Sequence, residues 1–274
     1  MDNQKIDEIE FVIFDTETTG FEPEAGDRII EIAAVKLIGT QIKNEFHALI
    51  NPCRQISEEA IAIHHITNAM LKDAPLMEEV MPKFLDFVEG SVLCAYNAAF
   101  DLGFINKELQ LLNRNLAWQI PVIDILAMAR RLLPHLGQYN LGYVANTLGV
   151  KKEQIHRALS DVYLSVDVFK WLKELLKAKG IDDFRSLQTL FGLASPYLND
   201  LRNQKISRIQ EALDLKVRLK IKYLSRSNAE VTEREVIPRQ IKQENNKYYL
   251  VGYCDLRKEE RTFSIDGILH LEIL

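Results

Sequence analysis

The chain has 274 residues, of which 47% are hydrophobic and 27% charged, as in an ordinary globular protein of one large domain or two smaller ones. No apolar run is long enough to span a bilayer, and residues 1–5 carry no basic patch before an apolar core, so we expect neither a membrane segment nor a signal peptide. Three scattered cysteines, Cys53, Cys94 and Cys254, indicate reduced thiols in the cytoplasm and argue against a disulfide framework or a zinc site.

The formal net charge of −5 does not point to a nucleic-acid binder, but the charge is unevenly distributed. Residues 206–274 hold 13 basic against 11 acidic residues, whereas residues 1–205 carry a net charge of −7. An acidic enzyme can still act on phosphate groups if bound metal ions supply the positive charge.

The first predicted element is a strand over residues 11–14, whose four consecutive apolar residues are typical of a strand buried on both faces. Asp15 and Glu17 follow it before the chain breaks at Gly20, and side chains two positions apart on a strand share a face. Two neighbouring carboxylates repel each other unless one is protonated or a cation lies between them. We favour a metal site; the alternative is that both are solvated where the strand leaves the core.

The rest of the first 180 residues predicts an α/β domain. The patterns favour a hairpin over 27–35 and 41–50, a helix over 76–89, a strand over 92–96, a helix over 100–112, a strand over 121–125, and helices near 126–133, 140–148 and 158–178. A three-stranded meander followed by alternating strands and helices implies a mixed sheet flanked by helices on both faces.

The composition changes after Gly180, which is a typical helix stop. We place a partly helical linker at residues 181–205, between a first domain at 1–180 and a second at 206–274. From about residue 206 the chain reads as strand-like. Residues 215–223 alternate apolar and basic side chains, which predicts a strand with a basic outer face, and two more strands are predicted at 248–253 and 261–265.

Asp101 is a third candidate metal ligand. It lies in the first turn of the helix after the strand 92–96, near the sheet edge where open α/β sheets place their ligands. Magnesium prefers oxygen ligands and keeps several waters, so a few carboxylates suffice to hold it. The alternative is that Asp101 only compensates the positive end of the helix dipole.

His156 and Asp161 form the last candidate pair. Five residues of continuous helix would point their side chains roughly 140° apart, so the two converge only if His156 lies in the loop before the helix and Asp161 on its early turns. A loop histidine that titrates near neutral pH suits a general base. The alternative is an exposed histidine and an ordinary helix aspartate.

These residues lie in segments that resemble the three motifs of the DnaQ-like 3′–5′ exonucleases, the epsilon-subunit-like proteins in the DEDDh branch of the ribonuclease H-like fold. The three segments are 15–20 (DTETTG), 96–101 (YNAAFD) and 156–161 (HRALSD). The resemblance spans roughly residues 8–178 and includes 27–32 (DRIIEI), 63–67 (IHHIT) and 129–134 (ARRLLP). Tyr96 departs from the usual His and His65 from the usual Gly, and neither position is a metal ligand in the family.

The resemblance implies a two-metal phosphodiesterase that releases nucleoside 5′-monophosphates from single-stranded 3′ ends. His156 would take the proton of the attacking water. Two Mg²⁺ or Mn²⁺ ions would be held by Asp15, Glu17, Asp101 and Asp161. The pocket for the terminal nucleotide would be formed by Thr18, Thr19, His64, Asn97 and Phe100.

The C-terminal part resembles the WYL domain of bacterial regulators and nucleic-acid enzymes, a small Sm-like β-barrel. The matching segments are 234–238 (REVIP), 248–253 (YYLVGY) and 261–266 (RTFSID). The resemblance implies a single-stranded nucleic acid or nucleotide ligand, and Arg239, Tyr248 and Arg261 are candidate contacts because Arg binds phosphate bidentately and aromatic rings stack on bases. Gly267 stands where the family often has a second Arg. The alternative is that the tyrosines are packing residues and the basic face is solvated.

We therefore expect a metal-dependent 3′–5′ exonuclease acting on single-stranded ends, of DNA in preference to RNA, with a C-terminal module that grips or senses nucleic acid. A polymerase or repair complex is the candidate partner, and a free-standing enzyme is the alternative. The competing function is a nucleic-acid-binding or ligand-sensing regulator with little nuclease activity. The presence of all five catalytic residues argues against it.

Overall fold

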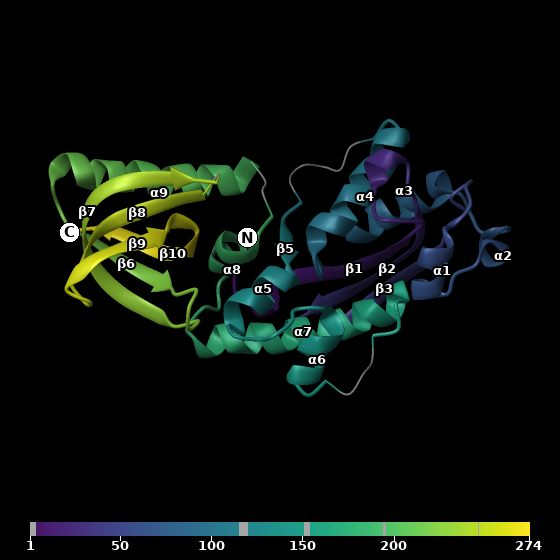
Figure 1. The fold of residues 1–274 in the computed structure, drawn as a ribbon, viewed down its shortest axis with the longest axis horizontal. Helices are drawn as coiled ribbons and strands as arrows, with labels where there is room; N and C mark the ends of the chain where they lie inside the picture. The colour runs from purple at the N-terminus through teal and green to yellow at the C-terminus, as the bar shows by residue number, and fades with distance from the viewer. Residues whose placement is uncertain (1–3, 115–119, 151–153, 194–195, 246) are drawn as a thin grey trace.

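The computed structural model describes residues 4–114, 120–150, 154–193, 196–245 and 247–274. Residues 1–3, at the end where no signal peptide is expected, lie outside these ranges. A mixed sheet covered by helices and a second, antiparallel sheet lie at opposite ends of the molecule (Figure 1). In the part of the chain that is described, no helix combines the length and the apolar character needed to cross a membrane.

The first sheet has the predicted mixed topology. Its strands are β1 (Glu10–Thr18), β2 (Ile29–Ile38), β3 (Gln41–Leu49), β4 (Val92–Ala95) and β5 (Val122–Asp124), in the spatial order β3-β2-β1-β4-β5. β1, β2 and β3 pair antiparallel as a meander, while β4 runs parallel to both β1 and β5. The apolar start of β1 therefore lies at the centre of the sheet, which confirms the prediction of a strand buried on both faces.

Alternating residues of β1 face two separate cores. Phe11 and Ile13 pack in one core with helices α5 (Ile125–Leu132), α6 (Leu141–Thr147) and α7 (Ala158–Ala178). Val12 and Phe14 pack in the other with α3 (Met77–Val88) and α4 (Ala98–Leu111). The short helices α1 (Glu58–His64) and α2 (Asn68–Leu71) flank a small cluster around Ile30. Because side chains alternate along a strand, Asp15 and Glu17 continue the row that faces α7.

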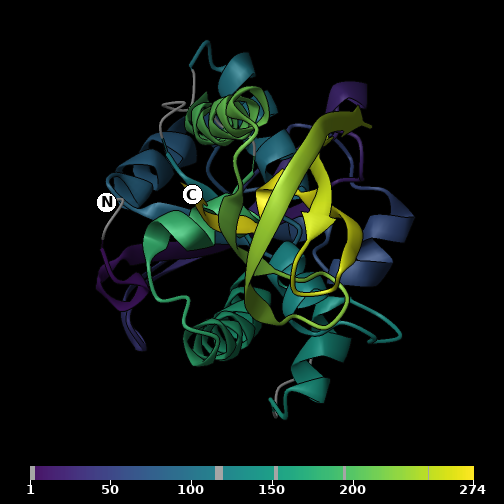
Figure 2. The same cartoon turned by 90° about the vertical axis from the view of Figure 1, so that its left-hand side faces the viewer.

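The second sheet is antiparallel throughout. Its strands are β6 (Leu219–Leu224), β7 (Val231–Glu244), β8 (Lys247–Cys254), β9 (Glu259–Ser264) and β10 (Ile268–Ile273), in the order β10-β6-β7-β8-β9. The strands curl around their own core, as the view onto this end of the molecule shows (Figure 2). Gly252 permits a close approach of β7 and β8, because a side chain there would meet the carbonyl oxygen of Ile237 at 2.5 Å.

The segment between the sheets differs from the sequence prediction. Helices α8 (Phe184–Phe191) and α9 (Pro196–Leu215) occupy it, so residues 206–215 are helical and not strand-like, and the strand predicted at 215–223 begins only at Leu219. Ile209 and Ala212 of α9 are buried in the core of the second sheet. Helix α9 therefore packs as part of the C-terminal domain. The strand-like interpretation was wrong over residues 206–215, because strand periodicity says nothing about a helix that covers the sheet.

The two domains share buried surface. Leu224, at the end of β6, is fully buried in the core of the first domain, and the guanidinium of Arg131 on α5 donates a hydrogen bond to its carbonyl oxygen. Helix α8 lies against β5 of the first sheet and against β10 and the short helix η3 (Ile265–Gly267) of the second domain. The C-terminal sheet is thus attached to the first domain through side chains as well as through the chain itself.

Candidate active site

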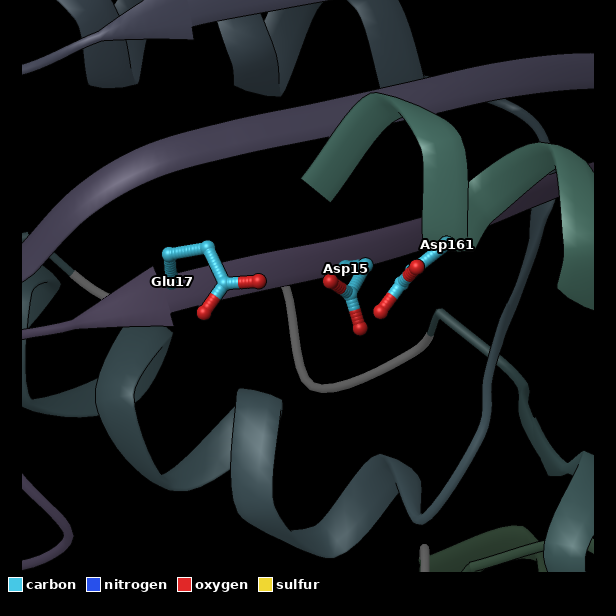
Figure 3. Close-up of side chains that lie close together, drawn as sticks. All are labelled: Asp15, Glu17 and Asp161. Carbon is cyan, nitrogen blue, oxygen red and sulfur yellow. The ribbon is translucent and has the colours of Figure 1, made fainter. Parts of the chain in front are cut away.

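Three carboxylates predicted as metal ligands converge. Asp15 and Glu17 project from β1 toward α7, and Asp161 comes from the first turn of α7 (Figure 3). One oxygen of each carboxylate lies within 4.8 Å of the others. Ligands from two elements that pack on each other are thus brought to one point, although they are far apart in the sequence.

The electrostatics of this cluster fit a divalent cation. Loss of hydration raises the pKa of Glu17 to about 8, with further contributions from the charges of Asp161, Glu31 and Asp101. The same causes, with desolvation the largest, raise the pKa of Asp15 well above its usual range. Such shifts mean that the ionised cluster has too little positive charge nearby. A donor set of carboxylate oxygens alone suits Mg²⁺ or Mn²⁺.

Asp101 is close to the cluster but does not join it. Its Oδ1 accepts hydrogen bonds from the backbone N–H of Thr16 at 3.0 Å and from the Thr16 hydroxyl at 2.8 Å, and the residue is buried. Burial is the main cause that raises its pKa to about 7, and its charge in turn raises the pKa of Asp15. The expected convergence of four carboxylates is therefore seen for three, with Asp101 held against the adjacent residue of β1.

His156 lies in the loop immediately before α7, as the 140° argument requires. It is exposed and adopts a left-handed backbone conformation with φ of 51°. The same loop surrounds Asp161, whose oxygens accept hydrogen bonds from the side chain of Gln154 at 3.0 Å and the backbone N–H of Ile155 at 3.3 Å. The pKa of Asp161 is raised by burial, which the charge of His156 opposes. The imidazole is thus exposed and near enough to the cluster for its charge to act on Asp161.

A buried ion-pair network fixes the start of α7 and was missed by the sequence analysis. Glu31 of β2 is 1% exposed, and it accepts hydrogen bonds from the Nε and Nη2 atoms of Arg157, from His47 and from the backbone N–H of Ala158 at distances between 2.7 and 3.1 Å. Burial tends to raise the pKa of Glu31, but these hydrogen bonds outweigh it and the pKa is lowered. A lone carboxylate inside the apolar run 29–35 is the signal that could have revealed this residue.

Three of the residues predicted to bind the terminal nucleotide are engaged within the protein. The Thr18 hydroxyl donates to the carbonyl oxygen of Gly20 at 2.5 Å, and the Thr19 hydroxyl donates to Asp27 at 2.9 Å. His64 is buried, and its Nδ1 accepts from the backbone N–H of Ile66 at 3.0 Å. Its Nε2 is buried without a hydrogen-bond partner among the described residues.

Asn97 and Phe100 are more accessible than these three residues. Asn97 is exposed and precedes α4 with φ of 71°, while the half-buried ring of Phe100 packs on Phe104 at 5.1 Å between ring centroids. Phe21, which the sequence analysis did not select, lies 6.5 Å from Phe100 and is 70% exposed. An apolar ring so exposed next to the carboxylate motif is the signal that was overlooked.

The C-terminal domain contains a second candidate site, lined by arginines. This pocket has a volume of about 400 Å³, and its lining includes Tyr223, Tyr249, Arg226, Arg234, Arg257 and Arg261. Of the three predicted contacts only Arg261 lies there. Arg239 is exposed on β7 outside the lining, and Tyr248 packs against the core of the second sheet, because neighbouring residues of a strand face opposite sides and it is Tyr249 that faces the pocket.

A residue of the first domain helps to explain why position 267 is a glycine. A side chain there would lie 2.8 Å from the Nη2 atom of Arg131 and 2.7 Å from the ring of Tyr223. Arg131 therefore occupies, from α5, the space beside Gly267. Burial lowers the pKa of Arg131 to about 10, and its Nε has no hydrogen-bond partner among the described residues.

Comparisons with known proteins agree with this geometry. The family model described as Exonuclease (RNase T) matches residues 12–169, and the model of the WYL domain matches residues 204–273. The DNA polymerase III PolC-type protein of Thermotoga maritima is 40% identical over 189 residues, which are 69% of this chain. The match spans only 14% of that relative.

Solved structures of other proteins are similar to this chain over part or most of its length. Exonuclease X in complex with 5′-overhanging duplex DNA is 31% identical, with a TM-score of 0.50 over 62% of this chain and 93% of that one. The E. coli ExoI–ssDNA complex, at 16% identity, shares its fold with 97% of this chain and 64% of its own, with a TM-score of 0.58. The chain therefore belongs to the exonuclease family through its residues 12–169, and its residues 204–273 form a C-terminal WYL domain.

Proposed function

We propose that the protein hydrolyses the terminal phosphodiester at the 3′ end of single-stranded DNA and releases nucleoside 5′-monophosphates. The observation that carries this proposal is the convergence of Asp15, Glu17 and Asp161 beside the loop of His156. Two Mg²⁺ or Mn²⁺ ions would be held by these carboxylates together with Asp101. When bound there, the ions supply positive charge to the scissile phosphate and to the attacking water.

The residues of the chain then have separate tasks. From its exposed position in the loop, His156 accepts the proton that the attacking water loses, and water adds to phosphorus as the 3′ oxygen of the shortened strand departs. Asp101 would join the other three carboxylates on the metal, in place of the hydrogen bonds that its Oδ1 accepts from Thr16. Phe21 and Phe100 offer rings on which the terminal base stacks, which is a sequence-tolerant contact.

The metal ligands are tested with single-stranded DNA labelled at its 5′ end, in Mg²⁺, in Mn²⁺ and in a chelator. We expect Asp15→Asn and Asp161→Asn to reduce mononucleotide release to the level seen in the chelator while the thermal unfolding of the metal-free protein shows that both variants fold. Asp86→Asn, an exposed aspartate of α3, is the matched control and should retain full activity.

His156→Ala separates the general base from the metal ligands. It should still bind Mn²⁺ but release mononucleotide roughly 10²–10⁴-fold more slowly, the usual contribution of a general base. Digestion at the wild-type rate by either aspartate variant refutes the metal assignment. An unchanged rate in His156→Ala refutes the general base alone.

For the arginine-lined pocket we propose a phosphate-bearing ligand, a nucleotide or the backbone of a single strand. Four arginines meet there with two tyrosines, and the described lining includes no carboxylate. The competing regulator function is supported if the protein binds single-stranded DNA or RNA in every metal tested without releasing mononucleotides. A polymerase complex is proposed as the partner because the relative from Thermotoga maritima is a DNA polymerase III PolC-type protein.

A further inference from the structure

A large cleft lies where the two domains meet, away from both sites described above. Its volume is about 1030 Å³, and its walls come from α8 and α9 on one side and from β6 and β10 on the other. We call it the junction cleft. Its basic lining residues are Arg185, Lys205, Arg208, Lys222 and His270.

The positive charge of the junction cleft has little compensation. Lys205, Arg208 and Lys222 donate hydrogen bonds to the main-chain carbonyl oxygens of Ile268, Leu271 and Gly180, at 2.5, 3.2 and 3.2 Å. None of these three forms an ion pair with a carboxylate among the described residues; Asp266 and Asp182 act on Lys205 and Lys222 only through their charge.

The acidic residues near the junction cleft are already engaged. Asp183 is the only carboxylate in the described lining, and it caps α8 by accepting from the backbone N–H of Ser186 at 2.8 Å. Asp266 lies next to the cleft and pairs with Arg202 at 3.2 Å. By contrast, Lys220, two residues before Lys222 on β6, pairs with Glu233 at 3.1 Å. A group of cations without such partners, in a chain whose net charge is −5, indicates an anionic ligand.

The other lining groups indicate what kind of anion fits. Ser186, Thr189, Asn203, Gln204 and Ser207 add hydroxyl and amide groups, and the described lining includes no Phe, Tyr or Trp ring, with the imidazole of His270 as its one aromatic group. Such a surface binds phosphate and sugar but offers no platform for stacking a base. Cations from α8, α9 and β6 are also more than one phosphate could use.

We propose that the junction cleft binds the phosphodiester backbone of a nucleic-acid strand, without reading its sequence. This inference rests on the proposed function in one respect, namely that the strand is the one whose 3′ end is hydrolysed. It adds a binding region to that function, separate from the terminal-nucleotide pocket and from the arginine-lined pocket.

The distance between the junction cleft and the active site predicts how long a strand must be to occupy both. Helix α7 carries Asp161 in its first turn, and just beyond its end the carbonyl oxygen of Gly180 contacts Lys222 of the cleft. A helix of 21 residues is about 30 Å long. Successive phosphates of a B-form strand advance about 3.4 Å along the axis, so a strand needs on the order of ten nucleotides to reach from one site to the other.

The test uses the full chain with Arg185→Glu and Arg208→Glu combined, two exposed residues of the cleft. The control, Lys83→Glu with Lys247→Glu, makes the same charge change at exposed positions elsewhere. Affinity for single strands of roughly six and roughly thirty nucleotides is measured by fluorescence anisotropy in a chelator. Hydrolysis of the short strand is measured in Mg²⁺.

We expect the cleft variant to bind the long strand at least tenfold more weakly than the control, and to hydrolyse the short strand as the control does. For the neutral variant, Arg185→Gln with Arg208→Gln, the slope of log affinity against log salt should fall by about 1.4, because each lost contact to a single strand removes about 0.7. Equal binding of the long strand by the cleft variant and its control overturns the proposal.

Two further outcomes separate the cleft from the catalytic proposal. If the wild-type protein hydrolyses no strand but the cleft variant still loses affinity for the long one, the cleft proposal stands and the proposed catalytic function fails. The protein is also tested in the same way with polyglutamate. If the substitutions at Arg185 and Arg208 weaken the binding of polyglutamate but not the binding of single-stranded DNA, the cleft binds an acidic protein and the proposal is overturned.

Discussion

At the scale of single residues, the carboxylates of the active site are held together against their own repulsion. Asp15 and Glu17 occupy the positions that continue the buried row of β1, and α7 adds Asp161 to the same face. Burial is the main cause of the raised pKa of Glu17, and repulsion from Asp161, Glu31 and Asp101 adds to it, so without a cation the cluster favours binding protons. A bound cation would therefore stabilise the ionised form of this cluster, to which Arg157 contributes the smallest of these effects on the pKa of Glu17.

The metal-free protein should lose stability as the pH rises from about 5 to about 8. Glu17 has an ordinary pKa of 4.5 when unfolded and about 8 when folded, so the folded state binds more protons in this range. The free energy of unfolding then falls with rising pH, and the loss is complete above the folded pKa. Asp101, with a pKa of about 7, acts in the same direction. Thermal unfolding in a chelator at a series of pH values measures the effect.

Glu17→Gln is the control for this pH dependence. It should make the unfolding temperature less dependent on pH, and Mn²⁺ should stabilise the wild-type protein more at pH 8 than at pH 6, because carboxylates must lose their protons to bind metal. A wild-type stability that rises between pH 5 and pH 8 in the chelator would contradict the assignment of the raised pKa values.

At the scale of elements, the start of α7 determines the site, since Asp161 and the loop of His156 both depend on where this helix begins. Glu31 fixes that start by accepting from Arg157 and from the backbone N–H of Ala158. We expect Glu31→Gln to lower the free energy of unfolding by about 1–3 kcal/mol, because it leaves buried donors without their charged acceptor. It should also lower kcat, because Asp161 and His156 lose their positions.

Urea denaturation and steady-state hydrolysis of single-stranded DNA measure the two effects of Glu31→Gln. Glu89→Gln, at an exposed position just after α3, is the matched control. Arg157→Lys should be affected in the same direction, since lysine cannot reproduce the two hydrogen bonds of the guanidinium. If Glu31→Gln keeps wild-type stability and activity, the network does not hold α7 in place.

At the scale of the whole molecule, the C-terminal domain contributes to the core of the exonuclease domain. Leu224 of β6 is fully buried there, and Leu269 packs against the same core. Deleting residues 206–274 would therefore expose this core as well as remove a binding module. A point substitution separates the two effects.

Leu224→Ala should lower the free energy of local opening in α5 and α7 by about 2–5 kcal/mol, the usual cost of removing a buried leucine side chain. Amide hydrogen exchange measures this opening. Leu250→Ala, fully buried in the core of the second sheet, is the matched control and should increase exchange in that sheet while leaving α5 and α7 unchanged. Unaltered exchange of α5 and α7 in Leu224→Ala would show that the domains are independent.

Much of the active site follows from the amino-acid sequence, for reasons visible in particular residues. The apolar run 11–14 with carboxylates two positions apart fixes both the depth of β1 and the shared face of Asp15 and Glu17. The angle between residues five apart on a helix required His156 to lie outside α7, and it does. These arguments use local geometry alone, which depends only on residues that are neighbours in the sequence.

Other features depend on contacts between distant segments, which no local pattern specifies. The sequence did not show that α9 packs on the core of the second sheet, nor that strand register places Tyr249 in the lining of the arginine-lined pocket and Tyr248 against the core. Glu31 and Arg131 gain their roles from partners 126 and 93 residues away in the sequence.

The sequence by itself therefore determined the family, the mixed sheet and the carboxylates Asp15, Glu17 and Asp161 that meet in the candidate site, because these follow from local periodicity and from motif spacing. The tertiary structure alone decided that Asp101 is held by Thr16, that Arg131 fills the space beside Gly267, and that uncompensated cations line the junction cleft. The physical reason is that charge compensation and burial depend on which surfaces meet, and that is settled only when the whole chain is packed.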